Sequence, residues 1–554
     1  MADAKVANAN EEGKSAEEMA KQYKEASISE FFEKNRHLLG YDNKQKALLI
    51  IVKEGVDNAL DACEEARILP DIYVKVELIE KEKYRVVIRD NGPGVLEKHI
   101  PNVFGVLLYG GKFHRLRQGR GAQGLGISCA VLYSQLTTGE PVEILSSIGD
   151  GKTHRFKLKI DVKNNEPIIL EKDVLEGKNW HGVQLTFICE GSYKEHKQSV
   201  LEYIRETSIS NPYANLVFES PTGRVEFRRG IEKLPAEPKE IQPHLHGVEI
   251  GVMTRMLSDT TARSIGGFLT SDFTRVGKTS ADEICKKAVI DPKISPKRIT
   301  DQQIVALVKA AKEVKLSRPP TDILSPLGEQ LVDNGLKKEL GPEFIAVVSR
   351  PPEVYRGWPF QIEAGIAYGG ALATTVKEPE IIRFANRVPL LYKQGDCAIT
   401  KAIEDIDWKR YGLDLWKKEN PEPVVLFVHM CSVWVPYTSE SKEAIASYPI
   451  ILKEIKLALQ ECARKLSLYL SGVRKAERIA EKKRVFEKYA KEVAIALEEL
   501  TGVEAKKTEA NILKMVEERW GEIMEMDQKE AEQGKISTEV ERVSRSRFKE
   551  SDEE

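Results

Sequence analysis

The feature that most constrains this chain is the stretch from Lys44 to Ser128, which carries three short blocks in a fixed order. The blocks are Glu54-Gly-Val-Asp-Asn58-Ala-Leu-Asp61, Asp90-Asn-Gly92-Pro-Gly94 and Gly121-Ala-Gln-Gly124-Leu-Gly126. They supply a polar helix face, an aspartate in a glycine turn and a glycine-rich helix start. The polar helix face suits a metal-bound phosphate, the aspartate suits a purine base, and the glycine-rich helix start suits a chain of phosphates. The combination indicates an ATP site.

The first block has the periodicity of a helix. Lys44 to Arg67 contains no Pro, has Gly only at position 55, and repeats apolar residues at helical spacing. Glu54, Asn58 and Asp61 then share one face, because residues three and four positions apart are neighbours on a helix. An Asn oxygen suits Mg²⁺, which takes few protein ligands beside phosphates and water. Glu54 can polarise the attacking water as a general base.

The second block follows a run rich in β-branched residues, Tyr84 to Arg89, so we expect Asp90 at the end of a strand. A carboxylate there can accept a hydrogen bond from a purine amino group. Gly92 and Gly94 allow the backbone to approach the base closely. The sequence therefore predicts an adenine contact at Asp90.

The third block opens an apolar segment that begins at Leu125. Glycines at a helix start present backbone N–H groups and the positive end of the helix dipole to phosphates. No Gly-Lys-Ser/Thr follows, so the block does not match a P-loop. The predicted contacts are Gly121, Gln123, Gly124, Leu125, Gly126 and Ile127.

Taken singly, the blocks are typical of a solvated helix face, a hairpin turn and a loop. Together they resemble the N box and glycine boxes of the GHKL ATPases. The resemblance implies a Bergerat α/β sandwich that binds ATP and Mg²⁺, with Asp61 in the ATP site. It also favours a lid, rather than a plain surface loop, for the basic stretch from Tyr109 to Gly121, with Lys112 contacting phosphate. The family commonly has Thr directly after the glycine of a later strand, but here Val183 follows Gly182.

Composition sets outer limits on function. The chain has 84 basic and 86 acidic residues and a net charge of −2, so any DNA site must be a local patch. Seven scattered cysteines, without a CxxC pair, indicate a reduced compartment and no structural zinc. No apolar run reaches the length of a membrane span. We expect no membrane contact and a cytoplasmic, nucleoid-associated protein.

The middle of the chain is predicted to be helical. A Pro-rich linker near Arg228–Pro243 precedes expected helices at 248–258, 265–272, 281–288 and 296–314, with a turn at 273–280. This pattern resembles the H2TH module. Its basic residues, with Arg275, Lys278 and Lys297 as the DNA-binding candidates, either touch phosphates or form a solvated face.

The remainder mixes strands and long helices. Expected strands at 344–349, 360–366, 381–384, 388–391 and 424–429 precede a helix at Ser447–Ser471 that is broken early by Pro449. Val473–Glu499 should extend this long helix, and a second helix at Ala505–Met524 should follow. This arrangement resembles the GHKL transducer. The stretches Phe384–Tyr392 and Val435–Ala446 are similar to those of the B subunits of DNA topoisomerase VI, which is a type IIB topoisomerase.

The expected fold class is therefore α+β and multidomain. The expected regions are a disordered tail (1–27), the GHKL ATPase (28–230), the H2TH-like helices (231–318), the transducer (319–472), a helical extension (473–526) and a charged, disordered tail (527–554).

The resemblance implies an ATP-hydrolysing, ATP-dependent subunit that dimerises through its ATPase domain to gate strand passage of duplex DNA. A separate A subunit would cleave the DNA, in an A₂B₂ heterotetramer. Lys442 would be the lysine of the transducer that contacts the γ-phosphate, with Lys453 and Lys409 as alternatives. Two other functions stay open: a MutL-like repair ATPase, which would lack the insert at 244–318, and an ATP-dependent chaperone or scaffold that never touches DNA.

Overall fold

The computed structural model of the chain describes residues 30–31, 34–110, 117–121, 124–177, 180–240, 242–417, 422–439, 441–515 and 517–518. The chain divides into two compact units, 1–466 and 467–554. The two tails predicted to be disordered, 1–27 and 527–554, lie outside the described residues. Among the described helices, none combines the length and apolar character needed to cross a membrane.

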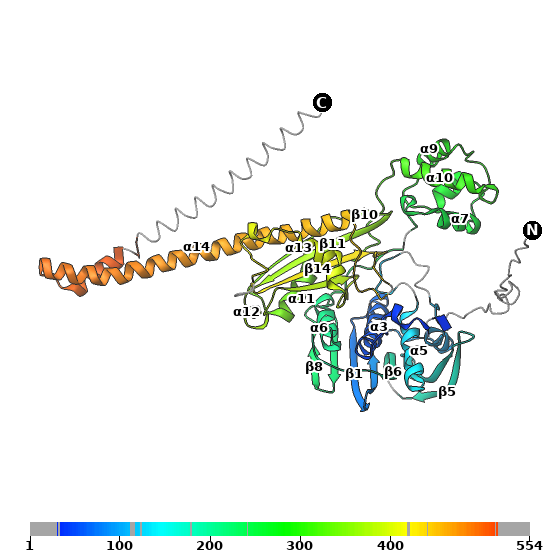
Figure 1. Cartoon of the computed structure of the whole chain (residues 1–554), viewed down its shortest axis with the longest axis horizontal. Coiled ribbons are helices and arrows are strands. Elements are labelled where there is room, and N and C mark those ends of the chain that lie inside the picture. Colours follow the sequence, from blue (N-terminus) through cyan, green and yellow to red (C-terminus); the bar gives the residue numbers. More distant parts are fainter. Residues whose placement is uncertain are drawn as a thin grey trace, which may run out of the picture. The chain divides into compact units, whose positions relative to one another are not determined.

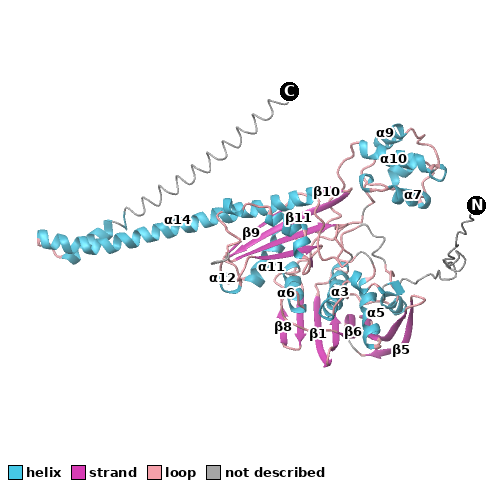
Figure 2. Ribbon diagram, viewed as in Figure 1, coloured by secondary structure: helices cyan, strands magenta, loops and turns pink. Residues whose placement is uncertain are grey.

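The first part of the chain forms an eight-stranded sheet in the order β5-β4-β3-β6-β2-β1-β7-β8 (Figures 1 and 2). Only β1 and β7 pair in parallel among the pairs of this sheet in the described residues. The strands are β1 (Asp71–Glu80), β2 (Lys83–Arg89), β3 (Val142–Ile148), β4 (Lys152–Asp161), β5 (Glu166–Glu176), β6 (His181–Glu190), β7 (Asn215–Ser220) and β8 (Gly223–Phe227).

One face of this sheet is covered by helices. Alternate residues of β2, namely Tyr84, Val86 and Ile88, are buried, as expected for a strand with one face on the core. The helices that pack there are α3 (Lys44–Glu65), α4 (Ile100–Gly105), α5 (Gly126–Thr138) and α6 (Val200–Ser210), with short 3₁₀ turns η1 (Arg36–Leu39) and η2 (Glu97–His99). This is the α/β sandwich that the resemblance to the GHKL ATPases implied.

A separate hydrophobic core holds the helical middle region together. Its elements are η3 (Leu245–Gly247), α7 (Ile250–Asp259), α8 (Ile265–Ser271), α9 (Lys278–Ala288), η4 (Pro296–Arg298) and α10 (Asp301–Glu313). No helix or strand lies between Phe227 and Leu245 in the described residues, which matches the predicted linker.

The helix expected over 248–258 is shifted slightly, to Ile250–Asp259, and two other predicted helices in this region differ more from the structure. The helix expected from 281 begins at Lys278, because Gly277 has the extended N-cap conformation. The helix expected over 296–314 is split into η4 and α10. The cause is Thr300, which caps α10. Its side chain accepts a hydrogen bond from the backbone N–H of Gln303, and its own backbone N–H donates to the side-chain oxygen of Gln303.

The region expected to be the transducer is built on a six-stranded sheet with the order β10-β11-β14-β12-β13 and β9 paired to β11. Its strands are β9 (Phe344–Ser349), β10 (Glu353–Tyr355), β11 (Trp358–Tyr368), β12 (Glu380–Ala385), β13 (Val388–Pro389) and β14 (Val424–Ser432). Its helices and turns are α11 (Glu329–Leu340), α12 (Leu372–Thr375), η5 (Gln394–Asp396), α13 (Ala398–Glu404) and η6 (Trp408–Tyr411).

The long helix α14 (Pro449–Thr501) follows β14. Pro449, expected to break the helix, is its first residue, a position where the missing N–H costs no hydrogen bond. The helix runs on without a break through Val473–Glu499, as predicted for an extension of the long helix. Residues 505–515 form a further helix, as predicted for Ala505–Met524 as far as the described residues reach.

Candidate nucleotide site

A cavity of about 340 Å³ lies where the three blocks meet, between α3, the end of β2 and the start of α5. We call it the main cavity. It is lined by these residues of the predicted site: Glu54, Asn58, Asp90, Gly121, Gly124, Leu125, Gly126, Ile127 and Lys442. Segments far apart in the sequence are therefore brought together around one space.

Asp90 lies at the end of β2 and is nearly buried. Its Oδ1 accepts the backbone N–H groups of Gly92 at 2.8 Å and Val183 at 3.1 Å. Burial raises the pKa of the Asp90 carboxyl to about 6, although those two hydrogen bonds favour the ionised form. Asp90 thus presents an oriented carboxylate whose charge depends on pH near neutrality.

The glycines around Asp90 shape the turn instead of lining the main cavity. Gly94 has φ +73°, and a Cβ there would overlap the backbone oxygen of Ser147. Gly182 on β6 has φ +131°, and a Cβ there would overlap the backbone oxygen of Asp90. Gly92 donates to Asp90 and does not contribute to the lining. Gly92 and Gly94, which were predicted as nucleotide contacts, therefore do not line the main cavity.

The apolar wall of the main cavity was not predicted from the motifs. It is formed largely by Ile50, Ala59, Ile88, Val95, Val103, Phe104, Val183 and Leu185. Val183 and Leu185 alternate along β6, so Thr186 points to the other face of the sheet. Val183 thus stands where the family commonly has Thr. The alternation of apolar residues along β2 and β6 was the signal in the sequence that could have identified this wall.

Glu54 is held against the start of α5. A Cβ on Gly126 would overlap Oε2 of Glu54, so glycine leaves room for the carboxylate in the position that it occupies. Gly126 is the first residue of α5, where backbone N–H groups have no partner within the helix. The predicted general base and the predicted phosphate-binding helix start therefore meet at one point of the main cavity.

Two charged neighbours of Glu54 were missed by the motif analysis. Lys53 lines the main cavity, and its Nζ lies 3.3 Å from Oε1 of Glu54 and 3.2 Å from Oδ2 of Asp57. Oδ1 of Asp57 accepts the hydroxyl of Tyr203 on α6 at 2.9 Å. The i,i+4 spacing of Lys53 and Asp57 was a signal for the second of these pairs.

Lys442 reaches the main cavity from the loop between β14 and α14. Its Nζ donates to the backbone oxygen of Arg120 at 3.3 Å. Burial lowers the pKa of the Lys442 amine, against the opposing effect of nearby carboxylates such as Glu54. Lys453 and Lys409, the alternatives, are exposed and do not line this cavity.

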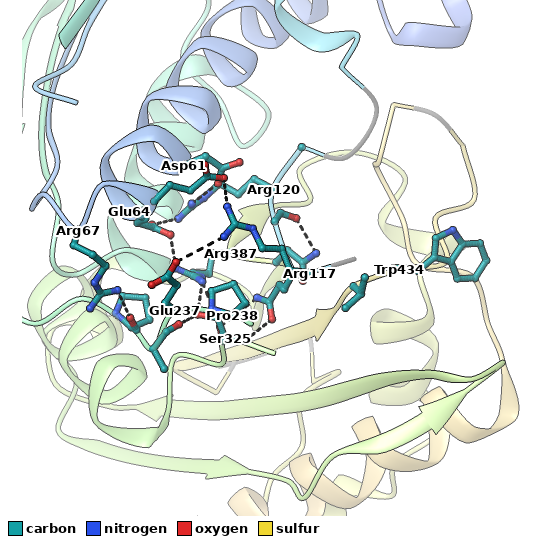
Figure 3. A pocket seen from close by; sticks show the side chains of 18 of the residues that line it. Asp61, Glu64, Arg67, Arg117, Arg120, Glu237, Pro238, Ser325, Arg387 and Trp434 are labelled. Atoms are coloured by element: carbon teal, nitrogen blue, oxygen red, sulfur yellow. Dashed lines mark hydrogen bonds and ion pairs between the residues drawn. The ribbon is translucent and has the colours of Figure 1, made fainter. Parts of the chain in front are cut away.

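Asp61 faces a second cavity, of about 190 Å³, at the junction of the ATPase and transducer regions (Figure 3). Its Oδ1 pairs with Arg120 Nη1 at 2.8 Å. Glu64 bridges two guanidiniums, with Arg120 at 2.5 Å and Arg387 at 2.8 Å. Burial alone would raise the pKa of Glu64, but Arg120 and Arg387 outweigh burial and lower it. These long-range ion pairs were not predicted.

The remaining predicted residues are either outside the described part of the chain or on the helical middle region. Lys112 and Gln123 are outside the described residues. Arg275, Lys278 and Lys297 are exposed on the helical middle region. Arg275 has φ +60° in the turn before α9, and Lys278 is the first residue of that helix.

The sheet, the three blocks and the cavity that they surround define a GHKL-type ATPase. Residues 43–162 match the family described as histidine kinase-, DNA gyrase B-, and HSP90-like ATPase. Residues 319–483 match the transducer of the topoisomerase VI B subunit. The predicted α+β class and the resemblance to GHKL ATPases with a transducer are thereby confirmed.

Named relatives extend this match over most of the chain. The B subunit of type 2 DNA topoisomerase 6 from Methanococcoides burtonii is 46% identical over 491 residues, which cover 87% of this chain and 79% of the relative. The same subunit from Pyrococcus horikoshii is 38% identical over 567 residues, covering 94% and 99%. The chain belongs to the family of B subunits of type 2 DNA topoisomerase 6.

Among solved structures, the 43K ATPase domain of Thermus thermophilus gyrase B aligns with 82% of this chain and 97% of its own length. Its sequence identity is 13% and its TM-score 0.38, which is a distant likeness.

Proposed function

We propose that this chain is the ATP-driven gate of a type IIB topoisomerase, acting on duplex DNA with a cleaving A subunit. The observation that carries the proposal is that Lys442, from the transducer region, lies in the same cavity as Glu54 and Asn58. A change at the phosphate end of a bound nucleotide would act directly on Lys442, and a short loop joins Lys442 to α14. The MutL-like alternative fits less well, because it would lack the helices between Ile250 and Glu313.

The residues of the main cavity support specific roles. Asp90 would accept the adenine amino group, and the start of α5 would donate N–H groups to phosphates. Asn58 would be a ligand of Mg²⁺, which supplies neutralisation of phosphate charge when bound. Glu54 would polarise the attacking water, and Lys442 would contact the γ-phosphate. Lys112 would close over the phosphates as part of a lid.

We further propose the predicted assembly and regions. Two B subunits would dimerise through their ATPase regions and join two A subunits in an A₂B₂ complex. The regions would be ATPase 28–230, an H2TH-like module 231–318, transducer 319–472 and a helical extension 473–526. The linker between β8 and η3 and the separate core of the helical region support the first two boundaries. A DNA-acting complex of this kind would work in the cytoplasm, on the nucleoid.

The test is Glu54→Ala. ATP hydrolysis should fall by about 10²–10⁴-fold, the usual contribution of a general base, while binding of a non-hydrolysable ATP analogue stays within a few-fold of wild type. Glu77→Ala is the matched control and should hydrolyse normally, because Glu77 lies on β1 with a side chain that is 40% exposed and paired with Arg85. Hydrolysis by Glu54→Ala at near the wild-type rate would refute the catalytic assignment.

A further inference from the structure

Glu54 is held by a buried charge cluster on its own helix. Adjacent residues of a helix do not face each other, yet Lys53 Nζ lies 3.3 Å from Oε1 of Glu54. The same ammonium lies 3.2 Å from Oδ2 of Asp57, one turn further along α3. The side chains of Lys53 and Asp57 are only 12% and 9% exposed. The ion pair with Asp57 therefore holds the Lys53 side chain where its ammonium also reaches Glu54.

Asp57, which holds the ammonium of Lys53, is itself held by a residue of another helix. Asp57 Oδ1 accepts the hydroxyl of Tyr203 at 2.9 Å, and Tyr203 is fully buried on α6. Burial opposes the charge of Lys53, but the carboxylates of Glu54 and Asp57 outweigh burial and raise its pKa, so the side chain stays an ammonium. Burial raises the pKa of the Asp57 carboxyl, and the ammonium of Lys53 and the hydroxyl of Tyr203 oppose burial by favouring the ionised form.

One oxygen of Glu54 thus has a charged partner, and the other occupies space beside Gly126. Oε1 meets the ammonium of Lys53, and Oε2 lies where Gly126 has no Cβ. We propose that Lys53, anchored by Asp57 and Tyr203, is a positioning residue that fixes the carboxylate of Glu54 in the main cavity for attack by water. This inference rests on the proposed role of Glu54 as general base.

The structural reason for such a residue is the freedom of a glutamate. An unrestrained Glu side chain samples several rotamers, and ordering it costs free energy in each catalytic cycle. A displacement of about 1 Å in a reacting group can cost on the order of 10²-fold in rate. A neighbouring ammonium that is already held by Asp57 orders the carboxylate before the nucleotide arrives, because its own position does not depend on the ligand.

The first experiment compares Lys53→Met with Lys44→Met in the full-length chain. Lys44 is on the same helix but pairs with Glu82 and Glu190 outside the main cavity. Lys53→Met should lower kcat by about 10²-fold while the Kd for a non-hydrolysable ATP analogue changes less than about threefold. Lys53→Arg, which keeps the charge, should recover part of kcat. Lys44→Met should match wild type.

A double substitution separates positioning from packing. In a Glu54→Ala background, Lys53→Met should cause no further loss of the residual rate, because Lys53 acts only through Glu54. A further loss equal to that in the wild-type background, or a large rise in Kd, would mean a structural role and overturn the inference.

The outcomes also distinguish this inference from the proposed function. If Glu54→Ala hydrolyses ATP normally, the proposed general base is wrong. If Glu54→Ala is inactive and Lys53→Met keeps its kcat, only the positioning role is wrong. Should Lys53→Met fail to fold, Tyr203→Phe decides instead, because it removes only the hydroxyl that holds Asp57. A severalfold lower kcat at unchanged Kd supports positioning, and an unchanged kcat rejects it.

Discussion

At the scale of single residues, Asp90 combines a position at the cavity wall with an unusual ionisation. Its carboxyl is nearly buried, and burial raises its pKa to about 6. The ionised form offers acceptors only, whereas the protonated form turns one oxygen into a donor. An adenine amino group, itself a donor, therefore binds best to the ionised form.

Nucleotide affinity should consequently depend on pH. Affinity should be highest and constant about one pH unit or more above this pKa of about 6, where Asp90 is ionised, and it should fall as the pH drops through the pKa and the carboxyl takes up a proton. Titration of a non-hydrolysable ATP analogue between about pH 5 and pH 8 spans this pKa and measures the effect. Asp90→Asn, which places an amide donor opposite the amino group, should bind the analogue very weakly at every pH. Wild-type affinity in Asp90→Asn would exclude the adenine contact.

At the scale of elements, the helical middle region has a hydrophobic core of its own, and its exposed basic residues are candidates for DNA contact. Lys278 begins α9 and Arg275 lies in the turn before it, while Lys297 lies on η4. The N-terminal end of a helix is favourable for a phosphate, so a lysine placed there adds to an existing attraction.

Replacing Arg275, Lys278 and Lys297 together with Ala should weaken binding to any duplex and lower the slope of log affinity against log salt by about one unit per lost phosphate contact. Preference among DNA sequences should not change, because phosphate contacts carry no sequence information. The control replaces Lys309, Lys312 and Lys315, exposed basic residues at and just beyond α10. If the first triple variant and wild type show the same slope of log affinity against log salt, Arg275, Lys278 and Lys297 do not contact phosphates and form only a solvated face.

At the scale of the whole molecule, the ATPase and transducer regions share buried charges. Glu64 of α3 joins Arg120 to Arg387, which lies in the turn between β12 and β13 (Figure 3). The backbone of Arg387 donates to His429, which in turn contacts Glu363. Removing one member of such a network leaves a buried charge without its partner, which is costly. The network links the two regions through buried contacts, and Lys442 adds a further one to the backbone oxygen of Arg120.

Lys442→Ala should therefore bind nucleotide nearly as wild type does but lose most ATP hydrolysis and nearly all relaxation of supercoiled DNA. The reason is that the compact charge of a lysine can follow a departing phosphate and then release it. Relaxation assays with the A subunit, beside analogue binding, make the measurement. Lys453→Ala, on the exposed side of α14, is the control. Normal relaxation by Lys442→Ala would rule this role out.

The sequence by itself determined the elements that depend on local pattern. Helical periodicity placed α3, β-branched runs placed β2 and β9, and glycines marked the start of α5, because these signals act within a few residues of the chain. Motif order was enough to bring Glu54, Asn58, Asp90 and the third block to one cavity. Helix boundaries near Lys278 and Thr300 were missed, since the extended Gly277 begins one helix and the capping side chain of Thr300 begins the other, and neither follows the apolar pattern.

Only the tertiary structure decided which charges meet. Asp61 was expected at the nucleotide, yet it pairs with Arg120, which lies 59 positions away, and Glu64 pairs with Arg387 across 323 positions. Likewise, Gly126 leaves room for the Glu54 carboxylate, a contact between two different helices. A carboxylate on a helix face has the same local sequence whether water, a metal or a guanidinium lies opposite. The partner is set by the packing of distant segments, and that packing follows from the burial of the whole core.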